Sequence, residues 1–130
     1  MYFYDDRVSA RRAVFEQYVS LLQDNPHIQW MPEADFGRST RWLTALNFVD
    51  TDVDINKLCY RMSEEKIEVR PLWKPMHKQP VFSEYAYYQH GDSVSDALFA
   101  NGVCLPSGSN LTEQQVTRVA TVLENMLEKN

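Results

Sequence analysis

The chain has 130 residues, the usual size of a single domain with its own buried core. Apolar residues make up 44% of it and charged residues 24%, a balance that is typical of globular proteins and excludes a disordered chain. The net charge of −5 argues against nucleic acid as a partner, because nucleic-acid binding requires a basic surface. No apolar run approaches the roughly 18 residues that a membrane span requires.

Targeting and redox signals are equally sparse. The first residues lack the basic and apolar regions of a secretion signal, so we expect a cytoplasmic protein. Cys59 and Cys104 are isolated thiols inside apolar patterns, and we expect both to be buried and unlinked. Without a Cys-x-x-Cys motif, the sequence predicts no metal site.

Apolar residues recur at helical spacing in four stretches. The first helix is expected to begin at Asp5 or Asp6 and to end near Gln23, before Asn25 and Pro26. The other three are expected at about 51–65, 93–101 and 112–127. Each of these three starts with the spacing of a capping box, formed by Thr51 with Asp54, Ser93 with Asp96, and Thr112 with Gln115.

Four shorter stretches are predicted as strands, at residues 28–31, 41–49, 67–70 and 103–105. The second is mostly apolar on both faces, which is typical of a central strand that is covered on two sides. Pro71 is expected to end the third, because proline cannot donate to a ladder. Gly102 stands at the expected C-terminal cap of the helix that precedes the fourth.

The order of these elements is helix, strand, strand, helix, strand, long loop, helix, strand, helix. No repeat or internal boundary interrupts it, so residues 1–130 are predicted as one domain. The predicted fold is an α/β (α+β) sandwich, in which helices pack on a small, mostly antiparallel sheet.

The stretch from Leu72 to Gly91 has no clear period, and an irregular stretch of this length in a compact domain is usually functional. Just around its start, Arg70, Lys74 and Lys78 place three positive charges and no acid between residues 69 and 83. Such a patch suits phosphate or carboxylate, and nearby aromatic rings can stack on a flat ligand. Solvated surface charge is the alternative, and composition alone leaves both interpretations open.

Residues Arg70 to Phe82 resemble a motif of the DegT/DnrJ/StrS aminotransferases, R-P-L-W-K-P-M-H-x-Q-P-x-F. Three further segments resemble parts of the same family in the same order. Asp5 to Tyr18 resembles the helix that leaves the large domain, Ser39 to Thr44 resembles S-N-R-W-L-T, and Phe99 to Thr112 resembles L-F-x-x-G-x-C-L-P-S-G-S-N-L-T. The resemblance covers nearly the whole chain, and its W-K-P-M-H form is similar to members that aminate UDP-linked 4-keto-6-deoxy-N-acetylhexosamines.

The resemblance implies the C-terminal small domain of a fold-type I enzyme that depends on pyridoxal phosphate (PLP) and transfers an amino group from glutamate to a nucleotide-linked keto sugar. The lysine that binds PLP in this family would lie in a large domain before Met1, and none of the five lysines here matches its motif. We therefore expect no catalytic residue and no bound PLP in this chain alone, which should not transaminate by itself.

Family members are usually homodimers, so the resemblance also implies a homo-oligomer. A small domain without its large domain should expose an apolar docking surface, for which Tyr2, Phe3 and Tyr4 are candidates. Two alternatives to the aminotransferase fragment stay open: a stand-alone module that binds a nucleotide sugar or a protein, and a remnant without function.

By resemblance, Arg70, Lys74 and His77 are the predicted substrate-binding residues, with no metal ligand among them. His77 is expected to face the substrate, or else to be a loop histidine that bonds to the backbone. Arg70 is expected to meet the glutamate carboxylate or a diphosphate, or else to be a surface residue at a strand end. Lys74 is interpreted as a surface residue or a diphosphate contact.

Three neighbouring residues receive structural interpretations. Arg41 is expected to form a structural salt bridge. Trp42 and Trp73 are expected to be packing residues rather than to stack on a nucleotide. Ser107, Ser109 and Asn110 are expected to bond their own backbone as turn and cap residues.

Overall fold

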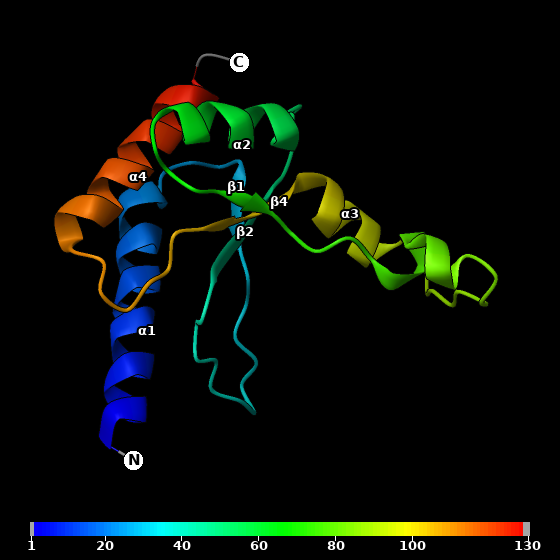
Figure 1. The fold of residues 1–130 in the computed structure, drawn as a ribbon, viewed down its shortest axis with the longest axis horizontal. Coiled ribbons are helices and arrows are strands. Elements are labelled where there is room, and N and C mark those ends of the chain that lie inside the picture. Colours follow the sequence, from blue (N-terminus) through cyan, green and yellow to red (C-terminus); the bar gives the residue numbers. More distant parts are fainter. Residues whose placement is uncertain (1, 129–130) are drawn as a thin grey trace.

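The computed structural model describes residues 2–128, and side-chain environments from residue 4 onward. In chain order its main elements are α1 (Tyr2–Leu22), β1 (Ile28–Trp30), β2 (Thr44–Phe48), α2 (Ile55–Glu64), β3 (Arg70–Pro71), α3 (Val94–Asn101), β4 (Gly102–Leu105) and α4 (Glu113–Leu127). The predicted helices and strands are all present, with bounds that differ at several ends (Figure 1). Within residues 2–128, no helix combines the length and apolar character needed to cross a membrane.

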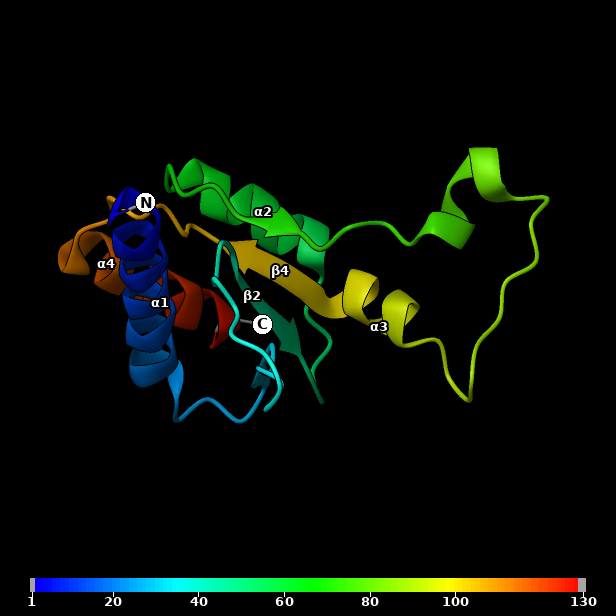
Figure 2. The same ribbon diagram turned by 90° about the horizontal axis from the view of Figure 1, so that it is seen from below.

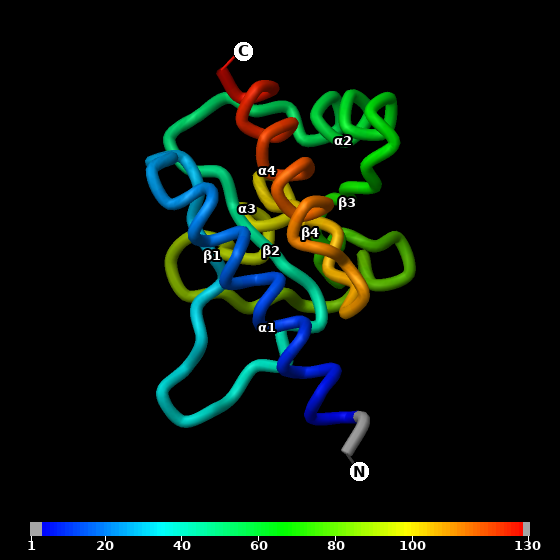
Figure 3. Tube along the Cα trace, turned by 90° about the vertical axis from the view of Figure 1, so that its left-hand side faces the viewer, coloured from blue at the N-terminus to red at the C-terminus, as the bar shows by residue number. Residues whose placement is uncertain are grey.

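The strands form one antiparallel sheet in the order β1-β2-β4-β3, which confirms the predicted sandwich and the interior position of β2. Helices α1 and α4 lie side by side in front of one face of this sheet, and α2 packs against α4 and the edge strand β3 (Figure 3). The core between them is centred on Tyr18, Leu46, Val103 and Leu123, which are completely buried. Burial raises the pKa of the Tyr18 hydroxyl, which donates a hydrogen bond to the Pro106 carbonyl oxygen at 3.0 Å.

The strand register also defines the other face of the sheet. Arg70 on β3 pairs with Cys104 on β4, which pairs with Ala45 on β2, so their side chains form a row across three strands. Leu46 and Val103 alternate with this row and belong to the core, so the row lies on the face away from α1 and α4.

Local capping signals had mixed outcomes. Thr112 accepts from the Gln115 backbone and completes the predicted capping box of α4. The predicted cap at Thr51 is wrong, because α2 starts later and Asp54 accepts from the Lys57 backbone instead. Ser93 precedes α3 as predicted but its side chain makes no cap bond. The first helix begins at Tyr2, ahead of the predicted start.

The third strand is shorter and later than predicted, and Pro71 lies inside it. Leu72 donates its backbone N–H to the Gly102 carbonyl oxygen at 3.0 Å, so the position before it is a non-hydrogen-bonded one. Because β3 is also the edge strand, the missing N–H of Pro71 leaves no gap in the ladder.

Between β3 and β4 the chain makes a long excursion, residues 72–101, which we call the arm. It projects from the side of the sheet opposite α1 and α4 and returns through α3 (Figures 1 and 2). The stretch predicted to be irregular contains two short 3₁₀ helices, Met76–Lys78 and Pro80–Phe82.

Gly102 closes the arm, and we predict that it cannot be enlarged. It follows α3 as expected, but its φ of −109° is extended, so space rather than conformation requires glycine. An added Cβ would lie 2.2 Å from Leu72 Cδ1 and 2.5 Å from the Leu98 carbonyl oxygen. Gly102→Ala should lower the free energy of unfolding by about 1–3 kcal/mol in urea titrations.

Gly37→Ala is the matched control, because a Cβ at Gly37 would meet nothing within 4 Å. This control should leave the unfolding midpoint unchanged or slightly raised. Equal midpoints for the two variants would contradict the steric argument.

Candidate functional site

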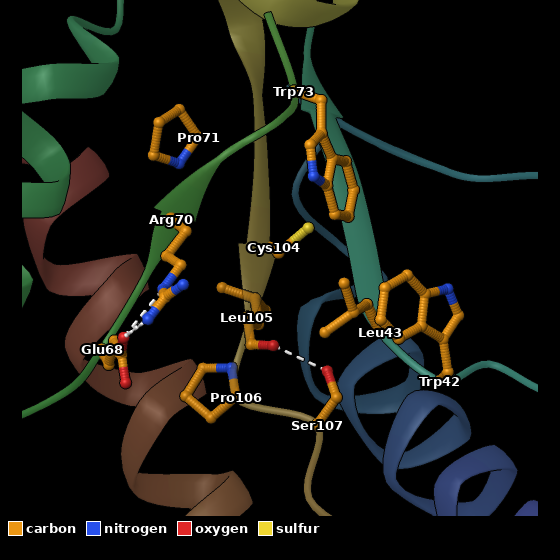
Figure 4. Close-up of a pocket in the computed structure, with 10 residues that line it drawn as sticks. All are labelled: Trp42, Leu43, Glu68, Arg70, Pro71, Trp73, Cys104, Leu105, Pro106 and Ser107. Atoms are coloured by element: carbon orange, nitrogen blue, oxygen red, sulfur yellow. Dashed lines mark hydrogen bonds and ion pairs between the residues drawn. The ribbon is translucent and has the colours of Figure 1, made fainter.

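A cavity of about 450 Å³, the indole pocket, opens on the sheet face that carries Cys104 and Arg70 (Figure 4). Its lining comes from the start of β2, from β3 and its flanks, and from the end of β4. The lining residues are Trp42, Leu43, Glu68, Arg70, Pro71, Trp73, Cys104, Leu105, Pro106 and Ser107. Cys104 is buried and unlinked, as expected, and burial raises the pKa of its thiol.

The two indoles of this pocket stack on each other rather than in the core. The ring centroids of Trp42 and Trp73 lie 6.0 Å apart with an interplanar angle of 24°. Both side chains stay largely exposed, at 61% and 65%, so the expected packing is found between the two rings and not in the core. Trp42 lies just outside β2, which is shorter than predicted.

Arg70 occupies the opposite side of the pocket and pairs with Glu68. Its Nε donates to Glu68 Oε1 at 2.8 Å, and the side chains are 77% and 72% exposed. Ion pairs with this exposure contribute about 0–1 kcal/mol, so an incoming anion can displace Glu68 at little cost.

Two side chains, those of Arg11 and Ser107, join the segments before β2 and after β4 that line the indole pocket. Arg11 of α1 donates to the carbonyl oxygens of both Trp42 and Ser107. The buried Ser107 hydroxyl donates to the Leu105 carbonyl oxygen and accepts from the Thr44 backbone N–H, both at 2.6 Å. Ser107 therefore bonds its own backbone, as expected, and in addition connects β4 to β2.

Glu33 holds the loop of residues 31–43 against α1. Arg12 donates to both of its carboxylate oxygens, at 2.7 and 2.9 Å, and the Ser39 backbone N–H donates to one of them. Arg41 lies 4.0 Å away, which confirms its predicted salt bridge. The Arg41 guanidinium also covers the Phe15 ring at 3.9 Å. This cluster fixes the backbone from which Trp42 projects.

His77 lies in the arm, in a second cavity of about 410 Å³ that Tyr87 also lines. Its Nε2 lies 2.8 Å from Asp96 Oδ1, and Lys78 Nζ lies 3.4 Å from the same oxygen. The imidazole stacks on Tyr87 with centroids 3.7 Å apart, and the Tyr87 hydroxyl lies 2.7 Å from Ser93 Oγ. His77 thus approaches a carboxylate at ion-pair distance, and among the described residues its ring makes no hydrogen bond to the backbone. That it faces a substrate stays a prediction.

The pKa of Asp96 reflects these contacts. Burial by itself would raise it, but hydrogen bonds from Ser93 and Lys78, together with the nearby charge of His77 and Lys78, leave the pKa lower than usual. The carboxylate is therefore charged across the physiological range and anchors the His77 side of the arm to α3.

The structure does not bring the three predicted substrate-binding residues into one pocket. Arg70 lines the indole pocket, His77 lines the arm cavity, and the exposed Lys74 lines neither. The predicted patch without acids is also partly neutralised, by Glu68 at one end and Asp96 at the other. Their role in binding substrate stays a prediction.

Sequence reasoning missed the two acids for different reasons. Glu68 is two residues before Arg70, and the period of a strand already places them on one face. Asp96 is 19 residues after His77 and was interpreted as part of a capping box, so no local signal identified it as a partner.

The expectation that this chain alone binds no PLP stays a prediction, and the positions of the described lysines bear on it. Among the described residues, no lysine lines the indole pocket. In the arm, Lys78 lies near His77 but is paired with Asp96. Lys66 lines two other pockets, on the side of α2 and α4.

Comparisons with known proteins agree on one family. The model of the DegT/DnrJ/EryC1/StrS aminotransferase family matches residues 2–124. A Bacillus subtilis (strain 168) relative named "Putative pyridoxal phosphate-dependent aminotransferase EpsN" is 46% identical over 121 residues, 92% of this chain and 31% of the relative. The GDP-perosamine synthase of Escherichia coli O157:H7 is 28% identical over 112 residues, 86% of this chain and 29% of that protein.

Solved structures show the same fold. The apo form of the sugar aminotransferase Spr1654 from Streptococcus pneumoniae, itself named putative, superposes with a TM-score of 0.83 over 97% of this chain and 32% of its own, at 16% identity. The chain thus spans about a third of the length of the relatives that it matches.

We predict that Glu33 makes the stability of the chain depend on acid pH. Its contacts with Arg12, the Ser39 backbone and Arg41 lower the pKa from 4.5 to about 2. The stabilisation is therefore complete above about pH 4.5 and is lost as the pH falls toward 2. Urea midpoints measured across this range should fall less steeply for Glu33→Gln, which also starts lower at neutral pH.

Glu84→Gln, at an exposed glutamate of the arm, is the control and should follow the parent chain at every pH. Parallel stability curves for Glu33→Gln and the parent chain would show that the carboxylate contributes nothing through its charge.

Proposed function

Because the chain belongs to the DegT/DnrJ/EryC1/StrS aminotransferase family, we propose that it forms the C-terminal small domain, residues 1–130, of a sugar aminotransferase. The family match over residues 2–124 carries this proposal, together with the third of each relative that the chain spans. The proposed reaction transfers an amino group from glutamate to a nucleotide-linked keto sugar. The W-K-P-M-H segment, residues 73–77, supports a UDP-4-keto-6-deoxy-N-acetylhexosamine as the acceptor.

In this proposal PLP is held by the part of the enzyme that corresponds to the other two thirds of the relatives, and it supplies the electron sink for amino transfer. Arg70, Lys74 and His77 contact the substrate. Arg70 suits a diphosphate or carboxylate, because its guanidinium can donate two parallel hydrogen bonds. The proposed enzyme is cytoplasmic, as expected from the sequence.

A second candidate is a stand-alone module that binds a nucleotide sugar or a protein. The observation that favours it is the closed core, in which Leu46, Val103 and Leu123 are fully buried without any other chain. A module of this kind would use the same exposed indole pocket without any PLP chemistry.

We predict that this chain can replace the matched segment of the Bacillus subtilis relative. A chimera that joins the preceding part of that relative to this chain should aminate UDP-4-keto-6-deoxy-N-acetylglucosamine with glutamate as donor, detected by mass spectrometry. Arg70→Gln and His77→Asn should each lower kcat/KM for the sugar roughly tenfold or more, because the first removes a charge-assisted contact and the second a ring nitrogen that can hydrogen-bond the substrate.

Arg38→Gln and His90→Asn make the same chemical changes at exposed positions and should leave the rate unchanged. A folded chimera that binds PLP but does not turn over would contradict the aminotransferase proposal. A chimera that reacts with glutamate but not with this sugar would contradict the proposed acceptor alone.

We also predict that the chain associates in solution. Large apolar side chains of the arm are exposed, among them Val81 at 72%, Tyr85 at 73% and Tyr88 at 88%. Tyr4 is also exposed, whereas the side chains of Tyr2 and Phe3 lie outside the described residues.

Light scattering should therefore detect dimers or larger species. Val81→Ser with Tyr88→Ser should shift them toward monomer, and Tyr60→Ser on α2 should not. A monomer at high concentration would rule out this surface as a homo-oligomer contact.

A further inference from the structure

The indole pair of Trp42 and Trp73 is unusually exposed for two large aromatic side chains. Each side chain is more than 60% exposed, yet the two rings hold a stacked geometry. Exposed tryptophans normally bury part of the ring against the core, because the indole is a large apolar group. Here the rings face a cavity of about 450 Å³, large enough for a small planar ligand.

The backbone that carries each ring is firmly held. Trp42 follows the loop that Glu33 and Arg12 fix to α1, and Arg11 bonds its carbonyl oxygen. Trp73 follows Leu72, whose backbone N–H continues the β3–β4 ladder. The surface is therefore preorganised, so ligand binding carries no free-energy cost for ordering these two loops.

The same cavity is lined by a positively charged side chain, Arg70, whose ion-pair partner can be replaced by a ligand. Arg70 lies on the face of the pocket with Cys104, and its partner Glu68 is about three-quarters exposed. An aromatic surface beside a displaceable guanidinium suits a ligand that joins a flat ring to an anionic group. A nucleoside diphosphate has this composition, since its base stacks on aromatic rings and its diphosphate binds arginine.

We propose that the indole pair is the platform on which the nucleobase of the nucleotide sugar stacks, while Arg70 leaves Glu68 to bind the diphosphate. The identity of the ligand rests on the proposed function, but the platform itself rests on the geometry of the pocket. The proposal assigns Trp42 and Trp73 a role in selecting nucleotide-linked substrates, and it separates their pocket from the arm cavity of His77.

Indole N–H signals in the nuclear magnetic resonance spectrum of the full chain provide the test. Trp30, Trp42 and Trp73 give three signals, and Trp30 is an internal reference because it packs against Phe15 instead of the pocket. UDP should shift the signals of Trp42 and Trp73 and leave that of Trp30 in place. Inorganic diphosphate should perturb the Arg70 guanidinium signal, and uridine should perturb the indoles alone.

Variants connect these shifts to affinity. Trp73→Leu and Trp42→Leu should each weaken UDP binding about tenfold, which corresponds to about 1.4 kcal/mol, because each removes one stacking surface. Arg70→Gln should weaken UDP and diphosphate but not uridine. The matched controls are Tyr60→Leu, an exposed aromatic on α2, and Arg38→Gln, and both should bind UDP like the parent chain.

Circular dichroism tests whether each variant is folded. We expect folded variants, because the replaced side chains are exposed. The proposal is overturned if UDP leaves both indole signals in place up to millimolar concentration, or if it binds equally well without either ring. An active chimera combined with either result would leave the aminotransferase proposal standing and remove the platform. An inactive chimera with the expected shifts would keep the platform as a nucleotide site.

Discussion

The arrangement of the indole pocket depends on one row of arginines along α1. Arg7 and Arg11 are four residues apart and share a face of the helix, from which they bond Ser109 Oγ and the Ser107 carbonyl oxygen. Arg12 points to the loop before β2 and holds Glu33. These bonds have a charged donor and are stronger than neutral ones. One helix therefore positions two loops that are more than 60 residues apart in the sequence.

Elements defined by local chemistry could be predicted from the sequence. The capping box at Thr112 and Gln115 needs only four consecutive residues, and the apolar pattern of residues 41–49 needs only one strand. Predictions that depended on neighbours in space were less successful. Pro71 was expected to stop its strand, but it lies inside β3. The edge position and the register with Val103 that allow a proline there exist only once the sheet has formed, so the sequence could not indicate them.

The candidate site shows the same division. Arg70, Lys74 and His77 could be selected from residue type and resemblance, but their partners could not. Asp96 approaches His77 only because α3 folds back along the arm. The contact of Trp42 with Trp73 joins segments on either side of β4, so neither ring predicts the other. Charge counted along the chain is therefore a poor measure of charge in space, since Glu68 and Asp96 both neutralise the apparent patch.

The arm begins and ends at a single ladder bond, in which the Leu72 backbone N–H donates to the Gly102 carbonyl oxygen. Its two ends are therefore already neighbours in the sheet, and the 30 residues between 71 and 102 form a closed excursion. The entropy of closing such a loop grows only slowly with its length. Insertions, deletions or wholesale exchange of this segment can then alter the surface around His77 without shifting the register of any strand. The sheet with α1, α2 and α4 therefore forms a frame that such an exchange leaves unchanged, so recombination of a single contiguous segment can remodel one surface of the domain.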